Sequence, residues 1–303
     1  MKKAIIATTA VLVLSFISTV CFGVALGSQG LHAFFRDGGV LDDWKDATAD
    51  WDDVIVYAAD LADIDDQSQL FASESVEISA VDTLKITAPC GNVRVRRGTG
   101  EKITVTLEQY SARVNPSSKY TVTIPQDGEI QLSAASDISG VAAVLTVYVP
   151  QPLAALTVDA QLGEVDIRDI TAEVLTVNLS TGDLDLAACT LRNANLRVST
   201  GDIDIKNTVS VAEKLVLDCA CGDADLELPA TAPFTLRYTV QTGDVELQTE
   251  LPSEWTRSVQ RNGVSCKGEI QHTGADGETG GLYEVTLNLG NLEIGGGTHS
   301  DDD

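Results

Sequence analysis

Acidic residues recur at a fixed interval in the middle of the sequence, and their chemistry is the first question that the chain raises. One column of carboxylates directly follows a repeated glycine, at Asp183, Asp202, Asp223 and Asp244. A second column lies two residues later, at Asp166, Asp185, Asp204, Asp225 and Glu246. Calcium prefers carboxylate oxygens, and glycoside hydrolysis uses a pair of carboxyl groups. The pattern therefore suggests two hypotheses, a calcium site and a polysaccharide-acting enzyme.

Regular repetition favours a structural role for these acids over catalysis. A catalytic pair should interrupt the pattern once, beside a basic or aromatic residue, whereas the arginines Arg168, Arg192, Arg197 and Arg237 are scattered. The histidines His32, His272 and His299 lie outside the repeats. The sequence offers no nucleophile, phosphate-binding loop or convincing metal cluster, so we expect a protein that is not an enzyme and has no cofactor apart from possible calcium.

Outward-facing columns of like charge need something to offset their repulsion. Carboxylates about 4.8 Å apart repel by roughly 0.9 kcal/mol per neighbour in a water-like dielectric. Backbone N–H groups could offset this for the first column, and water and salt for the second. Calcium between neighbouring copies is the functional alternative, with Asp183, Asp185, Asp202, Asp204, Asp223, Asp225 and Asp244 as its ligands.

The carboxylates are positioned by a repeat that is anchored on glycine. Gly163, Gly182, Gly201, Gly222 and Gly243 are 19, 19, 21 and 21 residues apart. Before each glycine apolar residues occupy every second position, as in Leu175, Val177 and Leu179, which is typical of a strand with one buried face. The alternation resumes after the glycine, so we interpret the glycine as a corner between two strands. Gly91 and Gly290 are the equivalent corners of less regular copies.

These features predict an all-β fold, a parallel β-solenoid with about 19–21 residues per rung. Neighbouring copies superpose without reversal, which argues against hairpins, and a period of two argues against helices. Leucine-rich repeats have a similar period, but their helical half and asparagine ladder are missing.

The N-terminus predicts a membrane location. Residues 1–27 contain Lys2 and Lys3, then an apolar run at 4–26 that would span roughly 34 Å as a helix, against a hydrocarbon core of about 30 Å. We expect one transmembrane helix that makes this a single-pass protein of the cell membrane, with the positively charged end in the cytoplasm and the C-terminal domain extracellular. A cleaved signal peptide is the alternative.

The remaining chain divides by composition. Residues 28–70 form an acidic stalk with a possible short helix, and residues 71–295 form the solenoid. Within it, regular rungs occupy 153–250, and 251–281 is either a side loop or a terminal cap that protects the last strand edge. The copy around Gly290 is then the final rung, and residues 296–303 form a disordered tail.

Charge and cysteine content limit the partners and the stabilising bonds. The net charge of −25 argues against nucleic acid or anionic lipid as a partner. Beyond Cys21 the chain has an odd number of cysteines, at Cys90, Cys189, Cys219, Cys221 and Cys266, which does not suggest a disulfide framework. A metal site at Cys219 and Cys221 lacks a second pair of ligands.

The run VYVPQPLAALTVDAQLGEVDI, followed by STGDLDL, STGDID and QTGDVEL, resembles the bacterial putative-adhesin family, also called the Toastrack domain. The resemblance covers residues 71–295. It implies a parallel β-solenoid ectodomain on a bacterial envelope protein, with a role in adhesion or in sensing envelope stress, and no catalytic residues. We therefore expect a surface for another envelope protein or for a cell-wall or host ligand.

Overall fold

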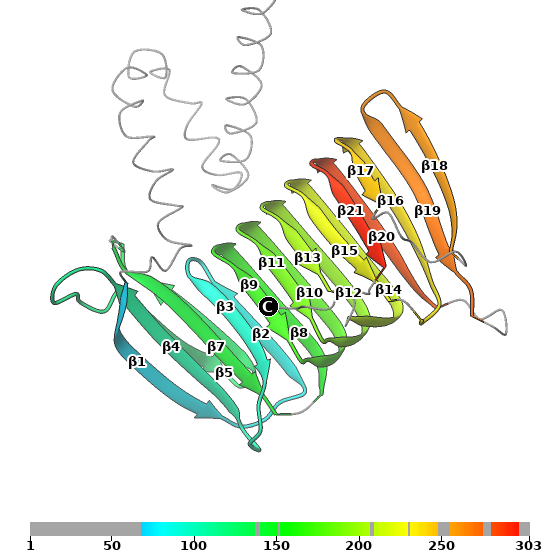
Figure 1. Ribbon diagram of the computed structural model, residues 1–303. Helices are drawn as coiled ribbons and strands as arrows, with labels where there is room; N and C mark the ends of the chain where they lie inside the picture. The colour runs from blue at the N-terminus through cyan, green and yellow to red at the C-terminus, as the bar shows by residue number, and fades with distance from the viewer. Residues whose placement is uncertain are drawn as a thin grey trace, which may run out of the picture. The chain divides into compact units, whose positions relative to one another are not determined.

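The computed structural model describes residues 68–296, apart from 137, 139, 151, 207–208, 230, 248–254 and 275–279 (Figure 1). The predicted membrane segment, the stalk up to residue 67 and the tail from residue 297 lie outside the described residues. Every regular element in the described part is a strand, so the prediction of an all-β domain is confirmed. This part of the chain holds no helix that is long and apolar enough to cross a membrane.

The strands form two large sheets. The first, sheet A, has the strand order β1-β4-β7-β3-β9-β11-β13-β15-β21-β17. Its strands are β1 (Gln69–Ile78), β4 (Ile103–Ser111), β7 (Ala142–Val149), β3 (Asn92–Arg97), β9 (Val165–Arg168), β11 (Leu184–Ala187), β13 (Ile203–Ile205), β15 (Ala224–Leu228), β21 (Leu292–Gly296) and β17 (Val245–Leu247).

The second sheet, sheet B, has the order β18-β19-β16-β20-β14-β12-β10-β8-β2-β6-β5. Its strands are β18 (Thr256–Asn262), β19 (Ser265–His272), β16 (Phe234–Thr242), β20 (Gly281–Leu289), β14 (Ser210–Cys221), β12 (Thr190–Thr200), β10 (Thr171–Thr181), β8 (Leu153–Leu162), β2 (Thr83–Ala88), β6 (Glu129–Ala134) and β5 (Tyr120–Gln126).

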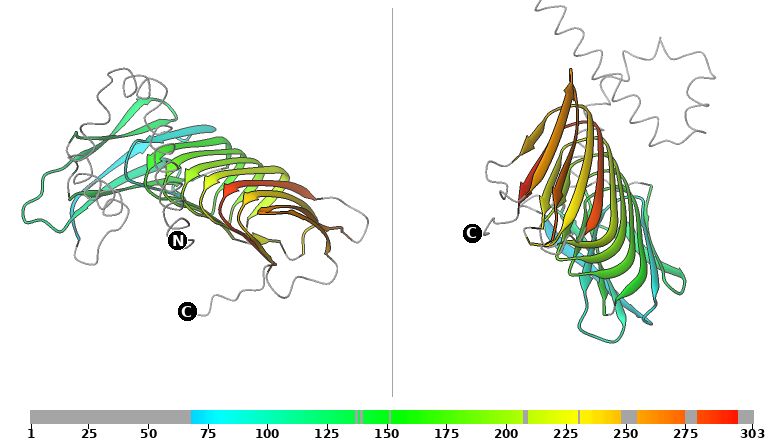
Figure 2. Two further views of the ribbon diagram at one scale, coloured as in Figure 1. Left: turned by 90° about the horizontal axis from the view of Figure 1, so that it is seen from above. Right: turned by 90° about the vertical axis from the view of Figure 1, so that its right-hand side faces the viewer.

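Each regular rung consists of one strand from each sheet, joined at a glycine corner, and successive rungs are seen as a row of arches in Figure 2. The strands β8, β10 and β12 of successive rungs pair in parallel without a register shift. Leu156, Leu175 and Ala194 therefore lie side by side. The alternating apolar residues face inward, where Val158, Val177 and Leu196 are fully buried. Period-two patterning on a parallel stack thus produces one continuous core between the two sheets.

The N-terminal end departs from the parallel arrangement that the repeat predicts. β4 pairs antiparallel with both β1 and β7, and β5 pairs antiparallel with β6. A two-residue turn at Asp127 and Gly128, where Gly128 has φ +78°, connects β5 to β6. Asp-Gly favours tight hairpins, so this local signal reverses the chain where the regular repeat would have continued in one direction.

The C-terminal copy of the repeat does not form the last rung, contrary to the sequence-based expectation. β20 and β21 lie between the rung β14/β15 and the rung β16/β17, as the red strands of Figure 1 show. The hairpin β18-β19 pairs antiparallel with the outer edge of β16 through β19. Because that edge of β16 is occupied, β20 pairs with the opposite edge of β16 instead.

The end of the core beneath the hairpin is closed by aromatic side chains. Trp255 packs edge-to-face on Phe234 with ring centroids 4.8 Å apart, and His272 and Tyr283 surround the same ring at 6.0 and 6.3 Å. The segment interpreted from sequence as a loop or a cap therefore contributes Trp255 and two strands to this end of sheet B.

Candidate functional site

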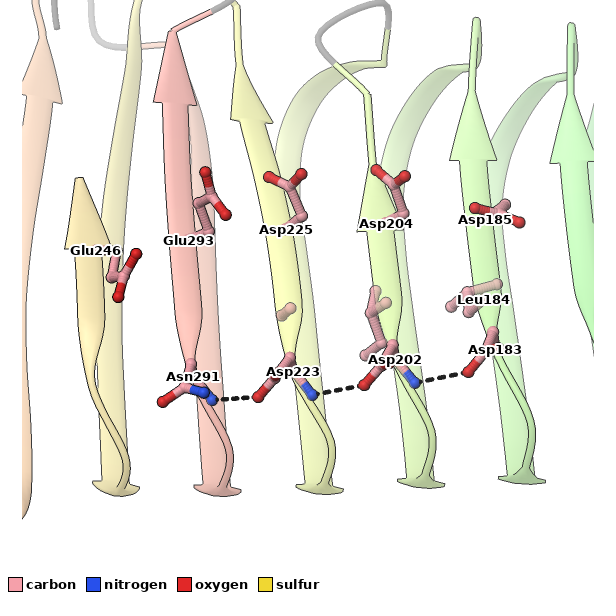
Figure 3. Close-up of a pocket in the computed structure, with 12 residues that line it drawn as sticks. Asp183, Leu184, Asp185, Asp202, Asp204, Asp223, Asp225, Glu246, Asn291 and Glu293 are labelled. Atoms are coloured by element: carbon pink, nitrogen blue, oxygen red, sulfur yellow. Dashed lines mark hydrogen bonds between the residues drawn. The ribbon is translucent and has the colours of Figure 1, made fainter. Parts of the chain in front are cut away.

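The carboxylates of the first column form a ladder of hydrogen bonds along the glycine corners, here called the corner column (Asp183, Asp202, Asp223, Asn291 and Asp244). Oδ1 of Asp183 accepts the backbone N–H of Asp202 at 2.9 Å, and Oδ1 of Asp202 accepts that of Asp223 at 2.8 Å (Figure 3). Asp223 accepts the N–H of Asn291 at 2.6 Å. In this column a side-chain oxygen of one rung accepts a hydrogen bond from the backbone N–H of the next rung.

Both the positive φ angle and the close approach of the neighbouring backbone require glycine at the corners. All seven predicted corners have φ between +109° and +144°, a region that residues with a side chain rarely adopt. A Cβ on Gly201 would lie 2.0 Å from the carbonyl oxygen of Gly182 in the neighbouring rung. The backbones of successive rungs thus approach each other at the corner, and this approach brings each Asp side chain within reach of the next N–H group.

The second column runs along the outer face of sheet A, and we call it the strand column (Asp166, Asp185, Asp204, Asp225, Glu293 and Glu246). Strand pairing places Asp185 beside both Asp166 and Asp204, and Glu293 beside both Asp225 and Glu246. Figure 3 shows the labelled members in one row, separate from the corner column. Asp185, Asp204 and Asp225 are half-buried, whereas Glu246 and Glu293 are exposed.

Two carboxylates of the strand column, Asp185 and Asp225, lie in surroundings that disfavour their ionisation. Burial, and after it the neighbouring carboxylates of Asp204, Glu164 and Asp166, raise the pKa of Asp185 to about 6, although Arg168 acts in the opposite direction. The pKa of Asp225 is also raised, by burial and then by the charges of Asp204 and Glu293. Lys206 offsets part of the repulsion, since its Nζ lies 2.8 Å from Asp204.

Asp166 differs from the rest of the strand column and from its predicted position on the open surface. It is only 4% exposed because two arginines cover it. Arg168 donates from Nε to Oδ1 of Asp166 at 2.8 Å, and Arg96 donates to its Oδ2 and, at 2.8 Å, to its backbone oxygen. Arg96 lies on β3, and the spacing of the repeats did not predict that this strand lies beside Asp166. These arginines neutralise the first member of the column.

A groove with a volume of about 540 Å³ lies along both columns. It is lined by Asp183, Leu184, Asp185, Asp202, Ile203, Asp204, Asp223, Ala224, Asp225, Glu246, Asn291 and Glu293. Six of the seven residues predicted as calcium ligands line it, and Asp244 does not. Two residues of the groove, Asn291 and Glu293, were not identified from sequence. The sequence does contain a signal for Asn291, because an asparagine follows the corner glycine at Gly290 as it does at Gly91.

The groove has mixed suitability for a cation. Oδ1 of Asp183, Asp202 and Asp223 already accepts a backbone N–H group, whereas Oδ1 of Asp204 and Oδ1 of Asp225 are buried without a hydrogen-bond partner. Carboxylates of the strand column are therefore the ones that could bind calcium. Across the described residues no group of three or more His, Cys, Asp or Glu side chains is arranged to hold a metal ion.

Four of the five cysteines in the described residues lie in the interior of the β-domain. Cys90, Cys189, Cys219 and Cys266 are buried and Cys221 is half-buried, and no disulfide joins them in the described part. Burial raises the pKa of Cys189 and of Cys219 to about 11, which keeps both thiols protonated at neutral pH.

The β-domain is similar to a family of known domains. Residues 80–273 match the family described as Toastrack DUF4097. No curated protein matches the chain in sequence.

Three solved structures are also similar. A putative cell adhesion protein from Clostridium sporogenes is 12% identical with a TM-score of 0.39, over 75% of this chain and 99% of that one. A putative adhesin from Bacteroides fragilis is 14% identical with a TM-score of 0.38, over 74% and 97%. A putative lipid binding protein from Parabacteroides distasonis is 12% identical with a TM-score of 0.24, over 74% and 94%.

Proposed function

The chain belongs to the Toastrack DUF4097 family, and from this premise we propose that it is a non-enzymatic, adhesin-like protein of the bacterial cell envelope. The acidic face of sheet A binds a partner, either a neighbouring envelope protein or a cell-wall or host ligand. An apolar segment at residues 4–26 anchors the protein in the cell membrane, and the β-domain lies outside the cell.

The strand column is the observation that carries this proposal. Its carboxylates lie on adjacent strands along one face, and two of them, Asp204 and Asp225, have a buried oxygen that accepts no hydrogen bond. A buried acceptor without a partner is costly, and the mutual repulsion of the carboxylates adds to that cost. A partner with regularly placed cationic or hydrogen-donating groups would relieve the repulsion. We therefore expect a partner whose contact surface is basic or rich in donors.

Crosslinking in live cells tests the proposal. A photo-activatable amino acid replaces Glu293 on the exposed part of sheet A, and a matched control replaces Arg197, whose side chain faces outward on sheet B. We expect a specific adduct from position 293 and none from 197, and we expect E246Q together with D225N to reduce its yield. Equal adducts from both positions would contradict the use of sheet A as the binding face.

The identity of the adduct separates the two roles within this proposal. A membrane protein in the adduct supports sensing of envelope stress, and wall or host material supports adhesion. Protease added to wall-stripped cells tests the topology, because a β-domain that is cut only after lysis is not extracellular. Turnover of a polysaccharide by the purified protein, lost in D185N, would contradict the non-enzymatic assignment.

A calcium-stabilised surface adhesin is the second candidate, and one observation favours it. The unpartnered oxygens of Asp204 and Asp225 belong to neighbouring parallel strands, which are about 4.8 Å apart. A cation between them would neutralise the repulsion that these carboxylates experience. Calcium would then stabilise the same face that binds the partner.

A further inference from the structure

The order of rungs in the stack differs from their order in the chain at one place. β15 ends at Leu228 and β16 begins at Phe234, yet the rungs that contain them are not neighbours. The C-terminal rung, β20/β21 (residues 281–296), lies between them and is paired in parallel on both sides (Figure 1). We call the space that it fills, between β14/β15 and β16/β17, the slot.

The C-terminal rung is fully integrated in the core, but among the described strands it is connected along the chain to the rest of the stack at one end only. Tyr283, Val285, Leu287, Leu292 and Ile294 are all buried. Residues 273–280 join the rung to β19, and no strand of the described residues follows β21 in the chain. Because only the N-terminal end of the rung is continuous with another described strand, the rung can leave the slot sideways without unthreading any of these strands.

The slot can close when it is empty, because the rungs on its two sides carry the same repeat. Lys214–Cys221 and Phe234–Thr242 pair with the same positions of β20, so Leu236 would lie over Leu215 and Gly243 over Gly222. Oδ1 of Asp223, which now accepts the N–H of Asn291, would then accept that of Asp244. Release of the rung therefore leaves no unpaired strand edge inside the stack.

The connection between the two sides permits both arrangements. Residues 229–233 link β15 to β16 across two steps of the stack, and the four residues 206–209 link β13 to β14 across one step. Five residues are thus long enough for either one step or two. A released rung, by contrast, has four unpaired strand edges, two on each of β20 and β21, and five exposed apolar side chains, so it requires a slot elsewhere.

We propose that the C-terminal rung is exchangeable and that the slot accepts the same rung from a second copy of the chain. The slot of a second copy has the correct register, the glycine corner and the inward apolar positions. Reciprocal exchange satisfies both released rungs at once and gives a closed two-fold pair, the usual outcome when identical elements are swapped. This inference does not depend on the proposed function of sheet A.

A directed crosslink in the full chain tests the exchange. Cys221 lies opposite Leu289 of the C-terminal rung on one side and opposite Thr200 of β12 on the other. The donor copy carries L289C and C221S, and the acceptor copy is the natural chain, so neither copy can form the bond within itself. The matched control donor carries T200C and C221S, which places the new thiol in a strand held at both ends.

Donor and acceptor are mixed in mild detergent, incubated in urea below the unfolding midpoint, diluted and oxidised. We expect at least ten-fold more disulfide-linked dimer from the L289C donor than from the T200C donor, with the bond mapped by mass spectrometry to position 289 and Cys221. Equal yields from the two donors, or no bond at Cys221, would refute the exchange.

A second measurement covers the case in which the L289C donor does not fold. The natural chain alone is given the same treatment, and its mass is measured by light scattering. A dimer that persists after dilution is expected, and a chain that remains monomeric contradicts the proposal.

Discussion

Asp244 donates its backbone N–H to Oδ1 of Asn291 at 3.0 Å, although Asn291 lies 47 residues further along the chain. Asn291 takes the place that an aspartate takes in the neighbouring rungs, and its own N–H bonds to Asp223. A neutral amide thus continues the corner column. The column therefore requires an acceptor oxygen at this place in each rung, and it does not require a negative charge.

The first prediction compares two substitutions in the corner column. D202N keeps the oxygen that accepts the N–H of Asp223 at 2.8 Å, so its free energy of unfolding should stay within about 0.5 kcal/mol of the natural value. D202A removes the acceptor and should cost about 1 kcal/mol. Urea unfolding measures both. An equal loss in both variants would mean that the charge itself is needed.

The second prediction concerns close approach at a corner. G201A should lower the free energy of unfolding by more than ~3 kcal/mol, because its Cβ would lie 2.0 Å from the Gly182 oxygen at φ +135°. The control G263A has φ +63° and nothing within 4 Å of its Cβ, so it should cost about 1 kcal/mol. Thermal unfolding compares them, and similar losses would contradict the packing argument.

The third prediction follows from the raised pKa of Asp185. The folded state holds the proton more tightly than the unfolded state, whose pKa is near 3.8. The ionised form therefore destabilises the fold above pH 6, and stability should increase as the pH falls from 6 towards 4. Because Asp185 is only half-buried, solvent screening reduces the effect to about 1 kcal/mol.

D185N tests this linkage. The variant should be more stable than the natural chain at pH 7 by about 1 kcal/mol, and the difference should vanish near pH 4. Urea unfolding at several pH values provides the measurement. A difference that is constant with pH would exclude Asp185 ionisation as the cause.

The fourth prediction concerns the covered carboxylate, Asp166. D166A leaves the guanidinium of Arg96, which is only 24% exposed, without its partner, so the free energy of unfolding should fall by about 3 kcal/mol. As a control, R192A removes an arginine that pairs with Glu173 and Glu213 on the surface. Its melting temperature should change little, because exposed ion pairs contribute little to stability.

The fifth prediction separates the calcium hypothesis from general screening. If calcium bridges the strand column, millimolar calcium should raise the melting temperature clearly more than sodium at equal ionic strength, because calcium binds only the folded state. The double variant D204N with D225N should lose this response, while D202N should keep it. Equal effects of calcium and sodium would remove the site.

Several features of this protein could be predicted from local sequence alone. Alternation around Val177 and Leu196 predicts strands with one buried face, and the glycine at a fixed interval predicts a corner, because both depend on backbone angles and side-chain period. The acidic residue that follows each corner is a suitable acceptor for a neighbouring N–H group. These are properties of one repeat and its nearest copies, so no tertiary information is needed.

The tertiary structure alone decided the order of the rungs and the environment of individual carboxylates. Each rung has nearly the same pairing surface, so repeat residues do not specify which copy neighbours which, and β19 on the outer edge of β16 determines that β20 enters between two earlier rungs. Asp166 and Asp185 occupy the same position in their repeats, but only Asp166 is contacted by Arg96, which lies 70 residues away in the sequence. Long-range pairing of this kind depends on which edges are already occupied, which the repeat does not encode.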